Sequence, residues 1–360
     1  MNTAARGALS ALSIPLRKER SMSDLDWNAL GAVSRVLFTV PLRPVQGDRF
    51  QPTGFPSLGP ATYQTRDGQK LLVESAQSMA NRLETTCWDT AQTAPIAVLD
   101  GVSHVTVTRK GKFLTDSMLE SHRVNSPYLL EGKDHKFFDT LKAELGGLAE
   151  GPIDRKKLAE VLLKFDIGSL IHGAFLAKKD LAGGRLRIAR ALSAFIEASD
   201  VKTAASGGVK NDHVNPSGVT KSGFGNVPFA RDEFVAEQIL LHINLDLAQI
   251  RGYGLEPKFQ QLLIVLALHR VRKLLDGDLR LRTACDLEPI DRDNIVASRP
   301  DDFKLPPLSE LEAGVQSAIE NCKEAMVHTT VTFEDELKKG KDAPEGDAAP
   351  DDDEADEPAE

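Results

Sequence analysis

The sequence predicts an α+β protein built on a largely antiparallel sheet. Residues 33–42 and 234–247 place apolar side chains at alternate positions, as strands with one buried face do. Residues 257–275 form a strongly apolar segment that suits a helix packed across a sheet. Strand-like and helix-like segments follow one another in mixed order and without an internal repeat, which favours α+β over α/β.

The first elements are a strand, a loop and a helix. Residues 33–42 alternate from Val36 to Leu42. Residues 44–56 then read P-V-Q-G-D-R-F-Q-P-T-G-F-P. Glycine allows unusual backbone angles and proline fixes φ, so this loop is expected to be shaped and stiff. Its amides, cation and aromatic rings suit a polar polymer, while the alternative is a turn-rich connector. Residues 72–84 follow with the spacing of an amphipathic helix, whose polar face is either solvated or lies under bound backbone phosphates.

The middle of the chain predicts further strands and helices. Residues 104–109 alternate as a strand and end in the basic turn R-K-G-K, and residues 134–165 indicate charged helices with a Gly-Gly break. Residues 167–177 predict a buried strand that carries His172, and residues 186–198 predict a helix. The cations at the start of that helix are Arg185, Arg187 and Arg190. Cations are unfavourable at a helix N-terminus, so either an anionic partner offsets the cost or this face is solvated.

The second half begins with an unusual stretch. Residues 202–229 are rich in glycine and show neither helix nor strand pattern. Loops of this length are usually functional or disordered, and we expect a protrusion that becomes ordered against a partner. Residues 278–287 predict a strand with leucines inward and arginines outward, and residues 306–326 are mostly helical.

Composition indicates a globular protein with acidic charge confined to one end. Hydrophobic residues make up 41% and charged residues 27% of the chain, which is ordinary for soluble proteins. Residues 341–360 contain ten acids and one lysine and so account for the whole net charge of −9. We expect residues 335–360 to be a disordered acidic tail, either solvating or competing for a basic groove, and residues 1–26 to be a disordered extension.

Motifs for catalysis or cofactor binding are absent from the sequence. It contains no phosphate-binding glycine loop, no H-E-x-x-H and no G-x-S-x-G. The three cysteines are far apart and form no C-x-x-C, which fits a reducing, cytoplasmic location. No apolar run approaches the roughly 18 residues of a membrane helix. We therefore expect no catalytic residue, cofactor, metal or membrane partner, and lone histidines such as His172 and His242 are expected to be structural.

Two motifs carry a family resemblance. Residues 44–56, quoted above, and L-L-V-E-S-A-Q-S-M-A-N-R-L-E at 71–84 resemble the backbone subunit of the type I-G (formerly I-U) CRISPR effector complex. This is the "Cas seven" group of the RAMP superfamily. The resemblance extends more loosely to about residue 330 and excludes both termini.

The resemblance implies one RRM-like, ferredoxin-like palm over 27–334, with inserted finger regions and a long thumb loop at 200–231. Such subunits polymerise along the guide RNA (crRNA), which then pairs with target DNA, and they assemble with other effector subunits in antiviral defence. The protein reads backbone shape while base pairing reads sequence. The aromatic signature of sequence-reading RRMs is missing here.

The RNA-binding residues that the resemblance implies lie in three segments. Arginine and lysine contact phosphates, and amide side chains contact sugar and phosphate oxygens. The loop and helix supply Arg43, Gln46, Arg49, Gln51, Ser75, Gln77, Ser78, Asn81 and Arg82, and the thumb supplies Lys202, Lys210, His213, Lys221 and Phe224. The basic turn adds Arg109 and Lys110, and Phe50, Phe55 or Phe224 are candidates to wedge against a base.

Two other functions stay open from the sequence. Relatives in type III systems cut RNA through an aspartate, so a metal-dependent RNA endonuclease that uses Asp48 is one alternative. The other is an unrelated structural protein whose loops only resemble RNA-binding loops.

Overall fold

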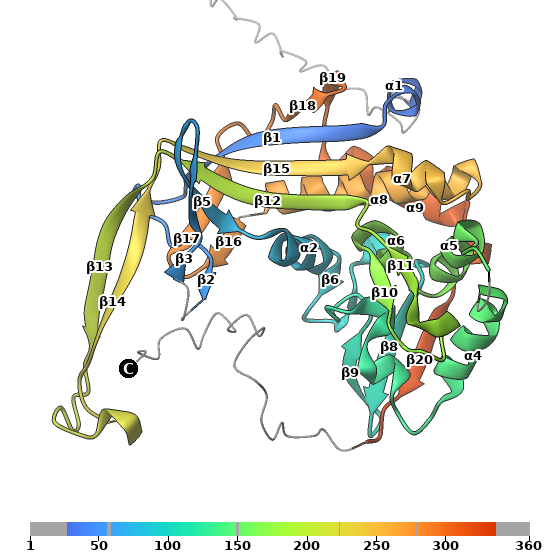
Figure 1. Cartoon of the computed structure of the whole chain (residues 1–360), viewed down its shortest axis with the longest axis horizontal. Coiled ribbons are helices and arrows are strands. Elements are labelled where there is room, and N and C mark those ends of the chain that lie inside the picture. The colour runs from blue at the N-terminus through green and yellow to red at the C-terminus, as the bar shows by residue number, and fades with distance from the viewer. Residues whose placement is uncertain (1–26, 56–58, 149–150, 223, 278, 336–360) are drawn as a thin grey trace, which may run out of the picture.

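An antiparallel sheet with helices on one face forms the centre of the molecule (Figure 1). The computed structural model describes residues 27–55, 59–148, 151–222, 224–277 and 279–335, and within them the architecture is α+β, as the sequence predicts. The expected N-terminal extension and all but the first residue of the expected acidic tail lie outside the described residues.

The main sheet contains the strands that the alternating segments predict. In spatial order they are β16 (Leu279–Arg282), β17 (Cys285–Pro289), β1 (Arg35–Pro44), β15 (Gln238–Asp246), β12 (Leu192–Ser199), β5 (Gly68–Glu74) and β4 (Thr62–Thr65). Every pair along this path is antiparallel. β18 (Val296–Arg299) pairs with β1 and with β19 (Asp301–Lys304).

Apolar residues of neighbouring strands lie in register on the buried face of this sheet. Phe38 lies opposite Ile243, which lies opposite Ala194, and all three are buried. α2 (Ala76–Thr85) packs on β12 and on α8 (Pro257–Asp276). α8 also contacts α6 (Ile167–His172), α7 (Leu247–Gly252) and α9 (Leu308–Glu320), which explains why most of its side chains are buried. The long helix predicted from its composition is confirmed.

A second lobe is inserted between α2 and β12 (Figure 1). Its elements are β6 (Trp88–Asp89), β7 (Ala94–Pro95), η2 (Ala97–Leu99), β8 (His104–Arg109), β9 (Lys112–Asp116), η3 (Arg123–Asn125), α3 (Pro127–Leu130), α4 (Lys136–Leu145), η4 (Gly146–Leu148), α5 (Arg155–Phe165), α6, β10 (Ala174–Leu176), η5 (Ala182–Gly184) and β11 (Leu186–Ile188). β20 (His328–Thr332) joins this lobe as a parallel neighbour of β8. Short elements elsewhere are α1 (Trp27–Ala32), β2 (Gly54–Phe55), β3 (Gly59–Pro60) and η7 (Lys323–Ala325).

A long hairpin projects from the end of the sheet, at the left of Figure 1. β13 (Lys202–Lys210) pairs with β14 (Val227–Val235) in continuous register, and η6 (Thr220–Ser222) lies in the connection. The prediction that 202–229 lacks strands is wrong, because cross-strand pairing overrides the weak β-propensity of a glycine-rich segment.

The predicted helix at 186–198 is also wrong, since these residues form β11 and β12. Alanines at 194 and 198 favour a helix locally, but with Leu192 and Ile196 they also alternate, and pairing with β15 and β5 selects the strand. The argument from cations at a helix N-terminus therefore no longer applies to this segment.

Three further boundaries differ from the sequence prediction. The predicted strand at 167–177 is α6 followed by β10; the helix ends at Gly173, whose φ of +84° favours glycine. The helix predicted from residue 72 begins at Ala76, because β5 runs to Glu74 and the Ser75 side chain caps the helix. The strand predicted at 278–287 is two strands, although Leu279 and Leu281 are buried as expected.

Candidate nucleic-acid interface

The loop of residues 44–53 is fastened to the base of the projecting hairpin. Phe50 N–H donates to Phe234 O at 2.9 Å, and Phe234 N–H donates to Phe50 O at 2.8 Å. The Phe50 side chain is 1% exposed, so it anchors the loop and is not the base wedge that the sequence suggested. The Phe55 side chain lies outside the described residues. The loop and the hairpin therefore form one structural unit.

Charged and amide side chains surround this anchor. Arg49 forms a salt bridge with Glu233 at 3.5 Å, and the Arg49 side chain is still 58% exposed. Arg231 donates to Gln51 Oε1 at 3.3 Å, and Arg282 donates to Gln51 O at 2.8 Å. We call this cluster the junction; it comprises residues 49–51 and 231–234 together with Arg282. It positions a cation and an amide at the root of the hairpin.

Arg82 on α2 is tied into the protein. Its guanidinium lies against Glu74 at 3.4 Å and donates to Arg280 O at 3.3 Å and to Leu281 O at 2.5 Å. Glu74, which is 1% exposed, also accepts a short hydrogen bond from Arg282. Arg82 and Arg282 thus share one buried carboxylate, which holds α2, β5 and β16 together beside the junction.

The other residues expected in the loop and helix have varied surroundings. Arg43 is exposed and pairs with Glu288 at 2.8 Å, and Gln46 is exposed. Ser75 accepts from Ser78 N–H at 3.2 Å as the N-cap of α2, so its hydroxyl is used within the protein. The members of this helix group that remain exposed are Gln77 and Asn81.

The hairpin presents cations along its length and apolar side chains at its tip. Lys202, Lys210 and His213 are exposed. Val214, Val219 and Phe224 are 95%, 66% and 55% exposed, an unusual concentration of apolar surface on a projecting element. The side chain of Lys221 lies outside the described residues.

The tip has a defined shape despite this exposure. Asp212 accepts hydrogen bonds from the backbone N–H groups of Val214, Asn215 and Gly225 at 2.8–2.9 Å. These hydrogen bonds stabilise the carboxylate and so lower the pKa of Asp212, and the bond from Asn215 N–H has the largest effect. The carboxylate therefore closes the tip loop and orients the apolar side chains.

Arg109 and Lys110 lie far from the junction. They occupy the β8–β9 turn of the second lobe, at the opposite end of the molecule from the hairpin (Figure 1). Lys110 N–H donates to Glu334 Oε1 at 2.9 Å. These two residues are therefore separate from the junction and from the surface around it.

Three arginines of this region were not among the predicted site residues: Arg231 and Arg282, which belong to the junction, and Arg280, which lies beside it. Arg280 and Arg282 alternate with buried leucines, and this alternation predicted that they point outward. The same pattern could have indicated them as candidate site residues. Arg231 lies over the Phe229 ring at 5.0 Å and reaches Gln51 across 180 residues of sequence, which no local pattern indicates.

The described residues show no group of three or more histidine, cysteine, aspartate or glutamate side chains arranged to hold a metal ion. Asp48 is exposed in the loop. In the same part of the chain, no helix combines the length and the apolar character needed to cross a membrane.

Residues 36–203 match the family model of CRISPR-associated protein GSU0053. The match covers a little under half of the chain and runs from β1 through the second lobe to the start of β13. It supports a CRISPR-associated protein. A comparison with curated protein sequences gave no match.

Two solved structures are similar at a low level. One, titled "CRISPR RNA-guided surveillance complex, pre-nicking", is 13% identical with a TM-score of 0.35, over 81% of this chain and 88% of that one. The other, Csc2 of Thermofilum pendens, is 10% identical with a TM-score of 0.30, over 85% of this chain and 79% of that one. TM-scores this low do not establish a shared fold.

Proposed function

We propose that the protein is a non-catalytic, guide-RNA-binding backbone subunit of a type I CRISPR effector complex, of the I-G type and the "Cas seven" group. Copies line up along the crRNA in the cytoplasm, hold its backbone and leave its bases free to pair with target DNA. Other effector subunits complete the complex.

The observation that carries this proposal is the hairpin with its anchored base. β13 and β14 project from the sheet and place exposed apolar side chains, including Phe224, at their tip. Exposing these apolar groups to water is unfavourable in free energy, so a partner is expected to cover them. An aromatic ring on a stiff hairpin suits insertion between bases, because stacking tolerates any base.

The strand order of the main sheet supports the ferredoxin-like palm. β1, α2, β12, β15, α8 and β17 occur in this order along the chain, with other elements between them, and give the pattern βαββαβ; the four strands lie in the order β17, β1, β15, β12 in the sheet. The hairpin extends the connection between β12 and β15, and the second lobe is the insertion between α2 and β12. The inserted lobe corresponds to the fingers and the hairpin to the thumb.

The exposed cations support a sequence-independent grip. Arg49 in the loop and the lysines of β13 present positive charge on the structural unit that the loop and the hairpin form. Phosphate contacts of this kind fix the position of a strand without reading its bases. Binding is therefore expected to be similar for all guide sequences and to weaken steeply with salt.

Nuclease protection of a crRNA-length RNA tests the proposal. The protein and the RNA are mixed, digested, and the protected fragments are sized. Fragments whose lengths rise in regular steps are expected, because each added copy shields the same number of nucleotides. The proposal would be refuted if the protein stayed monomeric and protected no RNA, even when its co-subunits were added.

The same samples test for catalysis. With Mg²⁺ added, intact RNA is expected after long incubation. Robust cleavage that the Asp48→Ala substitution abolishes would instead establish the endonuclease alternative.

A further inference from the structure

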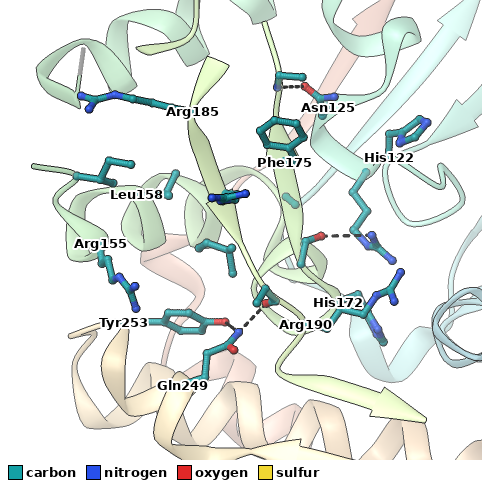
Figure 2. A pocket seen from close by; sticks show the side chains of 18 of the residues that line it. His122, Asn125, Arg155, Leu158, His172, Phe175, Arg185, Arg190, Gln249 and Tyr253 are labelled. Atoms are coloured by element: carbon teal, nitrogen blue, oxygen red, sulfur yellow. Dashed lines mark hydrogen bonds between the residues drawn. The ribbon is translucent and has the colours of Figure 1, made fainter. Parts of the chain in front are cut away.

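The second lobe contains a large basic cleft at the end of the molecule opposite the hairpin (Figures 1 and 2). Its cavity volume is about 1290 Å³, and α5, β10, β11 and the residues around η3 line it. Five arginines and two histidines are among the lining residues, and none of the described lining residues is an aspartate or glutamate. A concave surface with one sign of charge concentrates the electrostatic field and attracts anions.

Three of these arginines have guanidinium groups without a direct partner among the described residues. The side chains of Arg155, Arg187 and Arg190 form no hydrogen bond or salt bridge with them. In contrast, Arg123 is bound to the buried Glu84, with N···O distances of 2.5 and 2.6 Å. Burial, with Arg123 nearby, lowers the pKa of Arg190, so an anion in the cleft would relieve an unfavourable environment.

His172 provides a second, independent indication of a ligand. Its side chain is 1% exposed and lines the cleft, yet neither ring nitrogen has a hydrogen-bond partner among the described residues. Figure 2 shows it next to Arg190. Burial and then the charge of Arg270 lower its pKa well below the ordinary value, so the ring is neutral. Buried polar groups are normally satisfied, so this ring has an unused hydrogen bond to offer.

An aromatic ring stands beside the unpaired charge. Phe175 is 53% exposed, and it lies directly opposite Arg187 in the β10–β11 pair. The Ala177 N–H group donates to Asn125 Oδ1 at 3.3 Å, which fastens the end of β10 to the segment around η3. A ring for stacking next to a guanidinium for phosphate is the combination that binds single-stranded nucleic acid irrespective of sequence.

We propose that this cleft is a second binding site for a short segment of single-stranded nucleic acid. Arg155, Arg187 and Arg190 contact phosphates, Phe175 stacks on a base, and His172 bonds to a sugar, base or phosphate group. The site is additional to the guide-RNA surface at the junction and lies at the other end of the molecule. An acidic peptide would satisfy the arginines, but it would leave the exposed ring of Phe175 without a stacking partner.

Cross-linking and affinity measurements with the full chain test this site. The probe is a fluorescent pentauridine that carries one 4-thiouridine, and cross-linked peptides are identified by mass spectrometry. A cross-link in the peptide that contains Phe175 is expected. The Phe175→Ala substitution should weaken binding of the probe at this site about fivefold or more. Replacing both Arg187 and Arg190 by alanine should lower the slope of log affinity against log salt by about 1.4.

Matched variants keep the result interpretable. Lys136→Ala removes one charge from an exposed side chain of the same lobe and should leave binding unchanged. Arg155→Ala, on a separate element and exposed, tests the site without altering the β10–β11 pair. Circular dichroism confirms that each variant is folded.

Specific outcomes would overturn the proposal. One such outcome is that cross-links occur only at the junction and hairpin, and that replacing Arg187 and Arg190 leaves binding of the probe unchanged. The guide-RNA function would then stand, and the second site would be refuted. Displacement of the probe by a pentaglutamate peptide, with Phe175→Ala silent, would show an acidic-peptide site instead. Displacement by uridine monophosphate as effective as by pentauridine would show a mononucleotide site.

A different outcome would separate the two proposals. Cross-linking in the cleft when the junction does not bind RNA would support the second site and refute the guide-RNA function.

Discussion

Replacing Lys202 and Lys210 together by alanine tests the proposed phosphate contacts of the hairpin. Both side chains are exposed on β13, and neither forms a salt bridge with a described residue. The two residues are on the same face of the strand and about 26 Å apart, at ~3.3 Å per residue. At that separation they contact different phosphates, so their contributions are expected to add.

The size of the effect follows from counterion release. Each contact with a single strand contributes about 0.7 to the slope of log affinity against log salt, so the double variant should lose about 1.4. Between about 50 and 200 mM salt, the affinity of the wild-type protein should therefore fall about seven times more than that of the variant.

Fluorescence anisotropy with a labelled crRNA, titrated at several salt concentrations, measures both slopes. The control replaces Lys133 and Lys136, which are 86% and 88% exposed on the second lobe, and removes the same charge. Its slope should equal that of the wild type. Parallel slopes for wild type and the Lys202/Lys210 variant would refute the assignment of these lysines to phosphates.

Three further predictions concern the tip, the junction and a buried histidine. Phe224→Ala should weaken RNA binding about fivefold or more without changing the melting temperature, because its exposed ring stacks only on a partner. Glu74→Ala should lower the free energy of unfolding by about 3 kcal/mol in a denaturant titration, because Arg82 and Arg282 lose their shared buried carboxylate. Burial lowers the pKa of His269 to about 4 from 6.5, so the unfolded state binds more protons between these pH values. Stability should thus fall by up to about 3 kcal/mol as the pH drops through this range, and His269→Gln should flatten that part of the profile.

Each of these three has a contradicting result. A Phe224→Ala protein with unchanged affinity would show that the ring does not stack on RNA. Unaltered unfolding of the Glu74 variant would mean that the two guanidiniums find other acceptors. An identical pH profile for the His269 variant would assign acid sensitivity to other groups.

The sequence by itself determined the elements whose patterns are strong and local. The alternation in β1 and β15 and the apolar length of α8 predicted these elements correctly, because one repeated spacing specifies one buried face. The loop at 44–56 was recognised from its prolines and glycines, and the net charge was traced to the last twenty residues.

Tertiary structure decided what local patterns left ambiguous. Residues 186–198 favour a helix by composition, but β11 pairs with β10 and β12 pairs with β15 and β5, so they form two strands, and Arg187 and Arg190 line the cleft. Phe50 looked available for stacking, yet its pairing with Phe234 buries it. In each case the deciding partners lie tens to nearly two hundred residues away in sequence. Their contribution to burial and hydrogen bonding exceeds any local propensity, so only the folded chain could establish it.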